Sequence, residues 1–395
     1  NLFLFLPYLL SLIMVISKIP STKKSSFISM LEIAKECNAL DMILPDSDFI
    51  CPEGLIDLVG KYMRLGYNDF SPNEGVESLR EQIISLVNRE NHTDYKAASD
   101  ITITAGTSQA MSTAISTFVK DGEEVIIFEP VQESYAPFIE MSGGRPIFVN
   151  LRYPEYRIDW DEVKKLVTSK TRMIILQNPQ NPIGRLFQSE DLDQLKRMIN
   201  GTRIVVLCNE VYNNIVFDNQ KFKSIASVPE LASKSLIVSS FGTIFNISGW
   251  GISYIVGSDK LMSEFRKVHQ YQGFSLNTPA QFALGEFLQK EQKFSTISAY
   301  YQEKRDHFAK MLGDSNFEIV PTHSTFYQLL DYGKISDEPD SEFAVRLIKE
   351  FGIAAMPFSA FHHEKTKNQL IRICFAKSDE VLEDAARRFK KVPLA

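Results

Sequence analysis

Seven short runs of apolar, often β-branched residues recur between residues 100 and 257, and stretches with helical spacing separate several of them. The runs are continuously apolar rather than alternating, so a sheet built from them must be buried on both faces. This pattern predicts an α/β fold, with a mostly parallel sheet and helices on both faces. The runs are "DITITAG" (100–106), "EEVIIFEP" (123–130), "RPIFVNL" (145–151), "TRMIILQNP" (171–179), "TRIVVLCNE" (202–210), "SLIVSSFG" (235–242) and "GISYIVG" (251–257). The last run follows its predecessor after a short loop, which allows antiparallel pairing.

The remainder of the chain has a different pattern. Residues 278–312 have long helical spacing, and we expect one helix there that links two domains. The segments after it, 317–333, 341–361 and 370–392, indicate a strand, a helix with a strand, and a strand with a helix. This second unit is therefore predicted to be a smaller α+β domain, as a length of 395 residues also suggests.

Composition excludes several classes of protein. The formal net charge is -6 and the isoelectric point is about 5.7, so no basic surface for nucleic acid or for a membrane is indicated. The four cysteines are scattered without a CxxC pair, which is typical of reduced thiols in a cytoplasmic protein. The pair His362-His363 stands alone in a loop, and we expect it to be solvated rather than metal-ligating. No GxGxxG motif supports a dinucleotide site.

The chain is mainly apolar from Leu2 to Ile16, but this run is too short for a membrane span and contains Pro7. A basic segment and a small-residue cleavage site, which a signal peptide needs, are not visible. We favour the interpretation that Met14 is the start of the protein and that the preceding residues are upstream translation, over a vestigial anchor.

Ligands of such sheets bind at the carboxyl ends of the strands, so the loops that follow the strands are informative. Gly106, Thr107 and Ser108 begin a predicted helix, where backbone N–H groups can hold a phosphate; an ordinary helix cap explains them equally well. The sequence "NPQNPIG" forms a rigid turn. The stretch "SSFGTIFNISGWGISY" (239–254) has the form of an active-site loop, yet it contains no Lys, Arg, His, Asp, Glu or Cys.

Taken in order, these loops resemble the pyridoxal-phosphate-dependent aminotransferases of fold type I, class I, and in particular the kynurenine/methionine aminotransferase branch. The resemblance covers nearly the whole chain, from about Ser17 onward. It implies an N-terminal arm with part of the small domain at 17–48, a large domain at 49–285 and a small domain at 286–395. The motifs are "FSPNEGVESLREQI" (70–83), "ITITAGTSQA" (101–110), "EPVQESYAP" (129–137), "NPQNPIGR" (178–185), "NEVYNNIVFD" (209–218), "SSFGTIFNISGWGISY", "AAMPFSAF" (354–361) and "IRICFAK" (371–377).

The sequence departs from this family where the cofactor is held. The resemblance places the Schiff-base lysine at Thr243, and a hydroxyl cannot form an imine. It places a cation for the phosphate at Gly251, and the aspartate that faces the pyridine nitrogen at Asn209, whose amide weakens the electron sink. Further departures are Gln132 at the stacking aromatic, Phe70 at a tyrosine that reaches a phosphate across the dimer, Ile183 at a threonine, and Pro45 at a glycine.

Other site residues match the family. The resemblance assigns Asn181 and Tyr212 to the phenolic oxygen of the cofactor, and Arg372 to the substrate carboxylate. Gly106, Thr107, Ser108 and Ser240 match parts of the phosphate cup. Structural interpretations also stand: Asn181 shapes its turn, Tyr212 belongs to the core, and Arg372 pairs with an internal acidic residue.

Two functions follow from these residues. The first is a catalytically silent aminotransferase homologue, without covalent pyridoxal phosphate, that binds a ligand or a partner. The alternative is an active aminotransferase of aromatic amino acids, methionine or kynurenine with an atypical site. Lys260 and Lys267 lie nearby in sequence, but nothing places either in the pocket. The resemblance also implies a homodimer that takes a small amino acid or 2-oxo acid.

Overall fold

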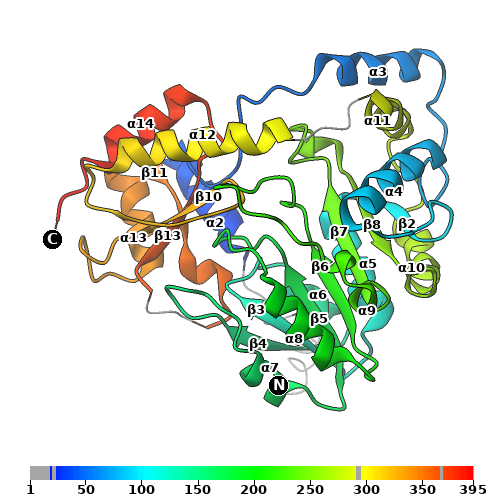
Figure 1. Cartoon of the computed structure of the whole chain (residues 1–395). Helices are drawn as coiled ribbons and strands as arrows, with labels where there is room; N and C mark the ends of the chain where they lie inside the picture. The colour runs from blue at the N-terminus through cyan, green and yellow to red at the C-terminus, as the bar shows by residue number, and fades with distance from the viewer. Residues whose placement is uncertain (1–17, 20–23, 291–294, 365–367, 395) are drawn as a thin grey trace, which may run out of the picture.

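The computed structural model describes residues 18–19, 24–290, 295–364 and 368–394, and a seven-stranded sheet forms its centre (Figure 1). The strand order is β2-β8-β7-β6-β5-β3-β4. Only β8 runs antiparallel to its two neighbours, β2 and β7, as the short loop before it allowed. The strands are β2 (Ile101–Ala105), β3 (Glu124–Glu129), β4 (Arg145–Asn150), β5 (Thr171–Gln177), β6 (Val205–Asn209), β7 (Ser235–Ser240) and β8 (Ile252–Gly257). The predicted α/β class, with its mostly parallel sheet, is confirmed.

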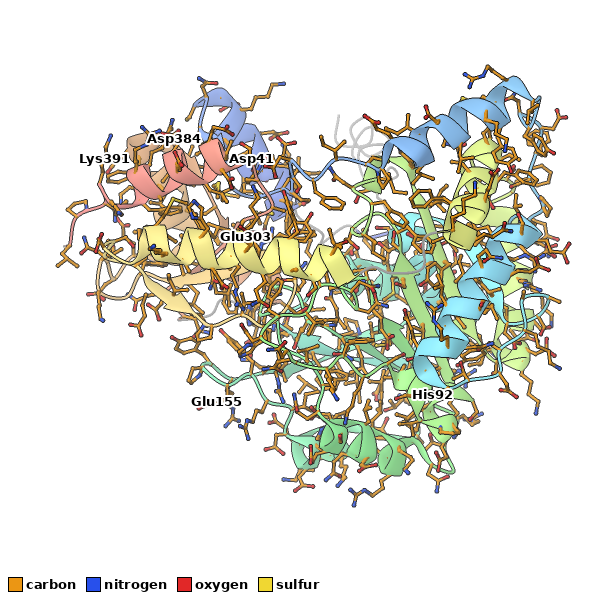
Figure 2. All side chains as sticks on the ribbon, turned by 45° about the horizontal axis from the view of Figure 1, so that its top comes forward. Asp41, His92, Glu155, Glu303, Asp384 and Lys391 are labelled. Carbon is orange, nitrogen blue, oxygen red and sulfur yellow. The ribbon has the colours of Figure 1, made fainter. Side chains whose placement is uncertain are left out.

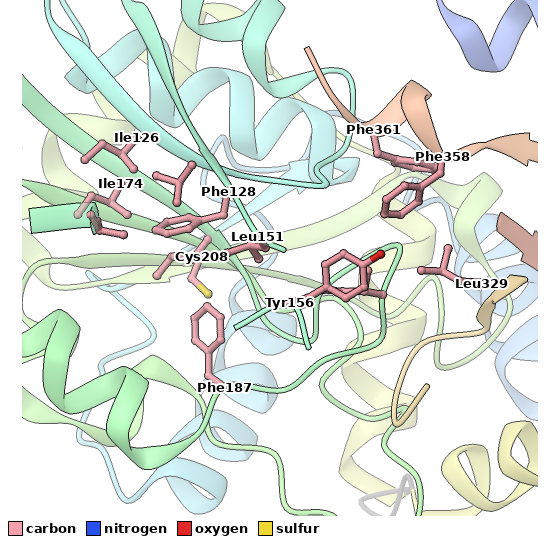
Figure 3. Close-up of a cluster of buried hydrophobic side chains, with 14 of the residues drawn as sticks. Ile126, Phe128, Leu151, Tyr156, Ile174, Phe187, Cys208, Leu329, Phe358 and Phe361 are labelled. Atoms are coloured by element: carbon pink, nitrogen blue, oxygen red, sulfur yellow. The ribbon is translucent and has the colours of Figure 1, made fainter. Parts of the chain in front are cut away.

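Both faces of this sheet are buried, because alternate residues of each strand enter different cores. Ile127, Ile175 and Leu207 pack with the helices α5 (Gly106–Phe118), α6 (Tyr135–Met141) and α10 (Asp259–Gln272). Their neighbours Ile126 and Ile174 face the opposite core, which Figure 3 shows. That core includes α2 (Ser26–Glu36), α7 (Trp160–Leu166), α8 (Ser189–Ile199) and α9 (Pro229–Ala232).

A third core covers the β2–β8 end of the sheet. It contains residues of α3 (Glu53–Arg64), α4 (Glu77–Asn91) and α11 (Thr278–Lys290), packed on Ile103, Ile252 and Val256. Gly75 precedes α4 with a φ of +94°, and a Cβ there would lie 2.2 Å from Cγ1 of Ile103. Glycine therefore allows the chain to cross the strand at close range.

The second unit is an antiparallel sheet of order β12-β13-β10-β9 with its own helices, as the C-terminal pattern predicted. Its strands are β9 (Glu318–Val320), β10 (Tyr327–Asp331), β12 (Met356–Pro357) and β13 (Leu370–Cys374). Helices α12 (Ser295–Leu312), α13 (Asp340–Arg346) and α14 (Asp379–Phe389) accompany them, and a π-helical turn, Leu347–Phe351, continues α13. A two-residue pair, β1 (Leu40–Asp41) with β11 (Ile353–Ala354), joins the N-terminal part of the chain to this unit.

The single helix expected over 278–312 is wrong, because the structure has α11 and α12 instead, and Figure 1 shows their axes in different directions. The physical reason is that their apolar residues serve different cores. Ala283 and Leu288 of α11 pack against α3 and α4, whereas Tyr301 and Phe308 of α12 pack in the core of the second unit. Glu303 lies on the exposed side of α12 (Figure 2).

No helix among the described residues is long and apolar enough to cross a membrane. The interpretation of residues 1–16 concerns a segment outside the described residues.

Candidate active site

The carboxyl ends of the parallel strands bring the predicted site residues to one edge of the sheet. Ala105 at the end of β2 pairs with Ile252 at the start of β8, and Ser240 pairs with Ser253. The residues next to them, Gly106 and Gly251, therefore meet at this edge together with Ser240. Asn209 ends β6, which lies beside β7 in the same sheet.

Thr243 follows β7 in a turn between the buried side chains of Phe241 and Ile244. Its hydroxyl donates a hydrogen bond to the carbonyl oxygen of Val211, at 3.0 Å. The side chain is short, half-buried and engaged by the protein itself. Neither Lys260 nor Lys267 replaces a lysine here: both are exposed on α10, and Lys267 pairs with Glu264 at 2.6 Å.

Asn209 is buried, and both ends of its amide are bound by the protein. Nδ2 donates to the hydroxyl of Tyr135 at 2.9 Å, and Oδ1 accepts from the backbone N–H of Val211 at 3.2 Å. Burial raises the pKa of Tyr135, so this phenol stays neutral. Position 209 thus holds a neutral amide with satisfied hydrogen bonds, where the resemblance implies a carboxylate.

At the end of β2 a helix N-terminus faces this edge of the sheet, and position 251 beside it is a glycine without a charged side chain. Helix α5 begins at Gly106, whose φ is +78°; its N-cap residue Ala105 provides no capping side chain, while Gln109 Oε1 accepts from Ala105 N at 2.6 Å. Thr107 is half-buried and Ser108 is exposed within the first turn, so the ordinary capping role is not what the structure shows. The Ser240 hydroxyl is used locally: it accepts from Gly242 N at 3.0 Å and donates to Ile252 O at 3.2 Å.

Arg372 lies on β13 and is 1% exposed, in a cage of aromatic rings. Its Cζ lies 3.8 Å from the ring centroid of Tyr327, 5.0 Å from that of Phe361 and 5.1 Å from that of Phe27. Nη1 donates to Asn181 Oδ1 at 3.3 Å, which brings the second unit to the turn after β5.

The hydrogen bonds of the Arg372 guanidinium are incomplete. Nη2 donates to Ile43 O at 3.0 Å, while Nε is buried without a hydrogen-bond partner. Among the described residues no acidic side chain forms an ion pair with Arg372, so the internal acidic partner considered above is not found there. A buried guanidinium in this state has capacity for a carboxylate.

Tyr212 is buried against Phe326 and Tyr327, with ring centroids 5.4 Å and 6.3 Å away, and burial raises its pKa. This geometry suits a core residue as well as a ligand-facing one.

The remaining departures from the family are dispersed: Ile183 is in the core, whereas Gln132, Pro45 and Phe70 are exposed. Phe70 packs edge-on against Phe274 at 5.3 Å.

The prediction that His362-His363 is solvated holds for His363, which is exposed, but not for the half-buried His362, and the His363 side chain also contacts the protein. Nδ1 of His363 lies 2.8 Å from Oε2 of the buried Glu129, and its ring stacks on Phe148 with a centroid distance of 3.7 Å. Burial lowers the pKa of His362 to about 4. The second expectation, that the two histidines bind no metal, stays a prediction. Among the described residues, no group of three or more His, Cys, Asp or Glu side chains could hold a metal ion.

These residues do not fit a covalently held pyridoxal phosphate. Position 243 offers no amine, position 209 offers a neutral amide already bound to Tyr135, and position 251 has no side chain. Gly251 has a φ of +66°, with nothing within 4 Å of an added Cβ, so space for a cation exists but no cation is supplied. No step of a cofactor reaction follows from this arrangement.

Comparison with known proteins identifies the family. The profile of "Aminotransferase class I and II" matches residues 61–389. The methionine aminotransferase of Escherichia coli is 37% identical over 377 residues, covering 95% of this chain and 98% of the relative. Human kynurenine--oxoglutarate transaminase 1 is 27% identical over 403 residues, covering 92% and 95%.

Solved structures agree with the sequence relatives. An Escherichia coli protein with a methionine aminotransferase function superposes with a TM-score of 0.90, at 37% identity and over 95% of this chain and 98% of the other. N-succinyldiaminopimelate aminotransferase of Mycobacterium tuberculosis gives 0.91 at 26% identity, over 96% and 100%. Fold type I and the resemblance stated above are thus confirmed, and the chain belongs to the class I and II aminotransferases, a family that uses pyridoxal phosphate.

Proposed function

We propose that this chain is a catalytically silent aminotransferase homologue that binds a small carboxylate, such as a 2-oxo acid or an amino acid, without covalent cofactor. The observation that carries the proposal is Thr243, whose hydroxyl is hydrogen-bonded to Val211 O. Transamination needs a lysine amine at this position twice, as the Schiff-base partner and as the group that moves the proton. A threonine hydroxyl performs neither task.

Two further positions support loss of the reaction. Asn209 cannot keep a pyridine nitrogen protonated, and its amide is already satisfied by Tyr135 and Val211. Gly251 provides no charge for a phosphate. Hydrogen bonds to charged groups contribute about 1.5–3 kcal/mol each, so losing both weakens cofactor binding by orders of magnitude.

Arg372, which the resemblance assigns to the substrate carboxylate, is the part of the site that we propose to remain in use. Arg372 is buried, lacks an acidic partner among the described residues and has a free Nε. A carboxylate that bridges Nε and an Nη atom would complete its hydrogen bonds in the bidentate geometry. Tyr327, Phe361 and Phe27 around the guanidinium exclude water and strengthen such a pair.

An absorption titration with pyridoxal phosphate, followed by borohydride and peptide mapping, tests the silent site. The methionine aminotransferase of Escherichia coli serves as the positive control. We expect no aldimine band and no reduced pyridoxyl-lysine peptide from this chain. A labelled lysine anywhere in the cleft would refute the proposal.

Carboxylate binding needs a separate assay, because it is independent of the cofactor. Thermal unfolding with and without a 2-oxo acid should show stabilisation of the wild-type protein and none of Arg372→Gln. Equal stabilisation of both proteins would show that Arg372 does not bind the carboxylate.

The second candidate is an active aminotransferase of methionine, kynurenine or aromatic amino acids. The 37% identity to a methionine aminotransferase favours it, as do Asn181, Tyr212 and Arg372 in family positions. Repeated turnover of methionine with pyridoxal phosphate present would support this second function. Less than one product molecule per protein molecule would contradict it.

We also propose a homodimer located in the cytoplasm. The support for the dimer is family membership and the exposed pair Phe70 and Phe274, which are 80% and 68% exposed. Large rings of this kind at a surface mark contact sites. Light scattering should give about twice 44.9 kDa, and a mass near 44.9 kDa would contradict the dimer.

A further inference from the structure

A separate pocket lies on the opposite side of the sheet from α5, between α4 and the segment after β6. It encloses about 260 Å³. Ile237 and Ser239 of β7 line it, whereas Leu236 and Val238 on the same strand pack in the core with α5. Figure 1 shows α4 beside this end of the sheet. We call it the Glu210 pocket, after the buried carboxylate that lines it.

The charges of the Glu210 pocket have one sign. Glu210 is 3% exposed, and Glu90 on α4 stands at the exposed margin. No lysine, arginine or histidine is among the described residues that line it. Burial raises the pKa of Tyr254 in the pocket, and Glu90 and Glu210 raise it further, so both carboxylates act on the same space.

Polar groups in the pocket have unused hydrogen-bonding capacity. The Ser239 hydroxyl is buried and makes no hydrogen bond of normal geometry, although the Tyr254 hydroxyl is close by. Glu210 accepts from Ile225 N at 3.0 Å through Oε1, and hydrogen bonds from Ser224 and Cys208 also lower its pKa. Asn214 donates to Asn213 at 2.7 Å. Two carboxylates and the Ser239 hydroxyl, with no lysine, arginine or histidine among the described lining residues, leave a place for an external donor with a positive charge.

We propose that the Glu210 pocket binds a small primary amine, with its ammonium group beside the Glu210 carboxylate and a hydrogen bond to Ser239 Oγ. Glu90 at the margin then faces the outer end of the ligand. An ammonium group has three donors, which match the carboxylate and hydroxyl oxygens here. A metal ion is the weaker occupant, because no set of three His, Cys, Asp or Glu side chains comes together in the described part of the chain.

Binding of an amine should release protons from Glu210. Burial raises the pKa of Glu210 to about 7, so the carboxyl is part-protonated at neutral pH. An ammonium ion stabilises the ionised carboxylate, so the fraction of a proton that Glu210 carries at that pH, at most one, leaves for the solvent as the amine binds. Binding should therefore tighten as the pH rises through 7, while the amine itself remains protonated.

Calorimetry on the full chain with 1,4-diaminobutane tests the proposal, and 1,4-butanediol is the uncharged ligand control. We expect the diamine to bind and the diol not to bind, with proton release to the buffer. Loss of one charged hydrogen bond weakens binding roughly tenfold to hundredfold, so Glu210→Gln and Ser239→Ala should show that loss. Glu303→Gln, which removes an exposed carboxylate elsewhere, should bind like the wild type.

Glu90→Gln is the second variant, because a change at the exposed margin leaves the core intact. It should weaken the diamine by several-fold even if Glu210→Gln does not fold. The proposal is overturned if the diol binds equally well, if the wild type does not bind millimolar diamine, or if both Glu90→Gln and a folded Glu210→Gln retain full affinity.

Discussion

Glu210 should make the protein less stable as the pH rises, and Glu210→Gln should remove this dependence. The carboxyl is buried, and burial is the main cause that raises its pKa from 4.5 to about 7. The folded protein therefore binds the proton more tightly than the unfolded chain. The stability from this group is full below pH 4.5, falls between pH 4.5 and about 7, and is lost above that range.

The magnitude follows from the two pKa values. A separation of about 2.5 units at 1.36 kcal/mol per unit corresponds to about 3 kcal/mol of unfolding free energy. Glutamine cannot titrate, and its carbonyl oxygen can still accept the hydrogen bond from Ile225 N. The free-energy difference between Glu210→Gln and wild type should therefore shift in favour of the variant by about 3 kcal/mol across this pH range.

Urea denaturation at a series of pH values measures this difference, and comparing variants cancels the other titrating groups. Glu303→Gln is the matched control, since that side chain is exposed and should leave the profile unchanged. Parallel profiles for Glu210→Gln and wild type from pH 4.5 to pH 8 would refute the reasoning, because Glu210 would then have the same pKa in both states.

Two further predictions concern the sheet edge. Thr243→Lys alone should give little half-transamination of methionine. The combination with Asn209→Asp and Gly251→Lys should give far more, because the effects of residues that act as a unit are not additive. The φ of +66° at position 251 should lower the unfolding free energy of the triple variant by about 1–2 kcal/mol. An equal rate for the single variant would show that the rest of the pocket is intact. His363→Ala should lower stability by about 1 kcal/mol, and more at neutral pH than near pH 4, because the hydrogen bond from His363 stabilises the ionised form of Glu129. Thermal unfolding at both pH values measures this, and an equal loss at both would exclude the hydrogen bond to ionised Glu129 as the cause.

The hydrophobic pattern was sufficient to predict the strands of the seven-stranded sheet, because burial on both faces leaves a continuous apolar run in each strand. Parallel strands then require their carboxyl ends to meet, so the common edge of Gly106, Asn209 and Ser240 could be expected from sequence alone. The antiparallel direction of β8 was also accessible, since a short loop rarely permits a parallel return.

Other features depend on partners distant in sequence. Helical spacing over 278–312 does not reveal that Ala283 and Phe308 face different cores, so the division into α11 and α12 could not be seen. The contact of His363 with Glu129 joins residues 234 positions apart, and no local pattern marks it. The Tyr135 hydroxyl that binds Asn209 was missed for the same reason, although a buried amide always raises the question of its partner.

The pairing of Leu40 with Ile353 has a consequence for synthesis on the ribosome. The two residues are 313 positions apart, and every strand of the seven-stranded sheet lies between them. At about 5–20 residues per second, β1 waits roughly 15–60 s for its partner strand to be made. During that interval the seven-stranded sheet can form, while β1 remains without its partner strand and α2 lacks the part of its core that Ala354, Phe358 and Phe361 supply. A nascent chain arrested before residue 353 should thus expose the segment 26–41 to protease and to chaperones.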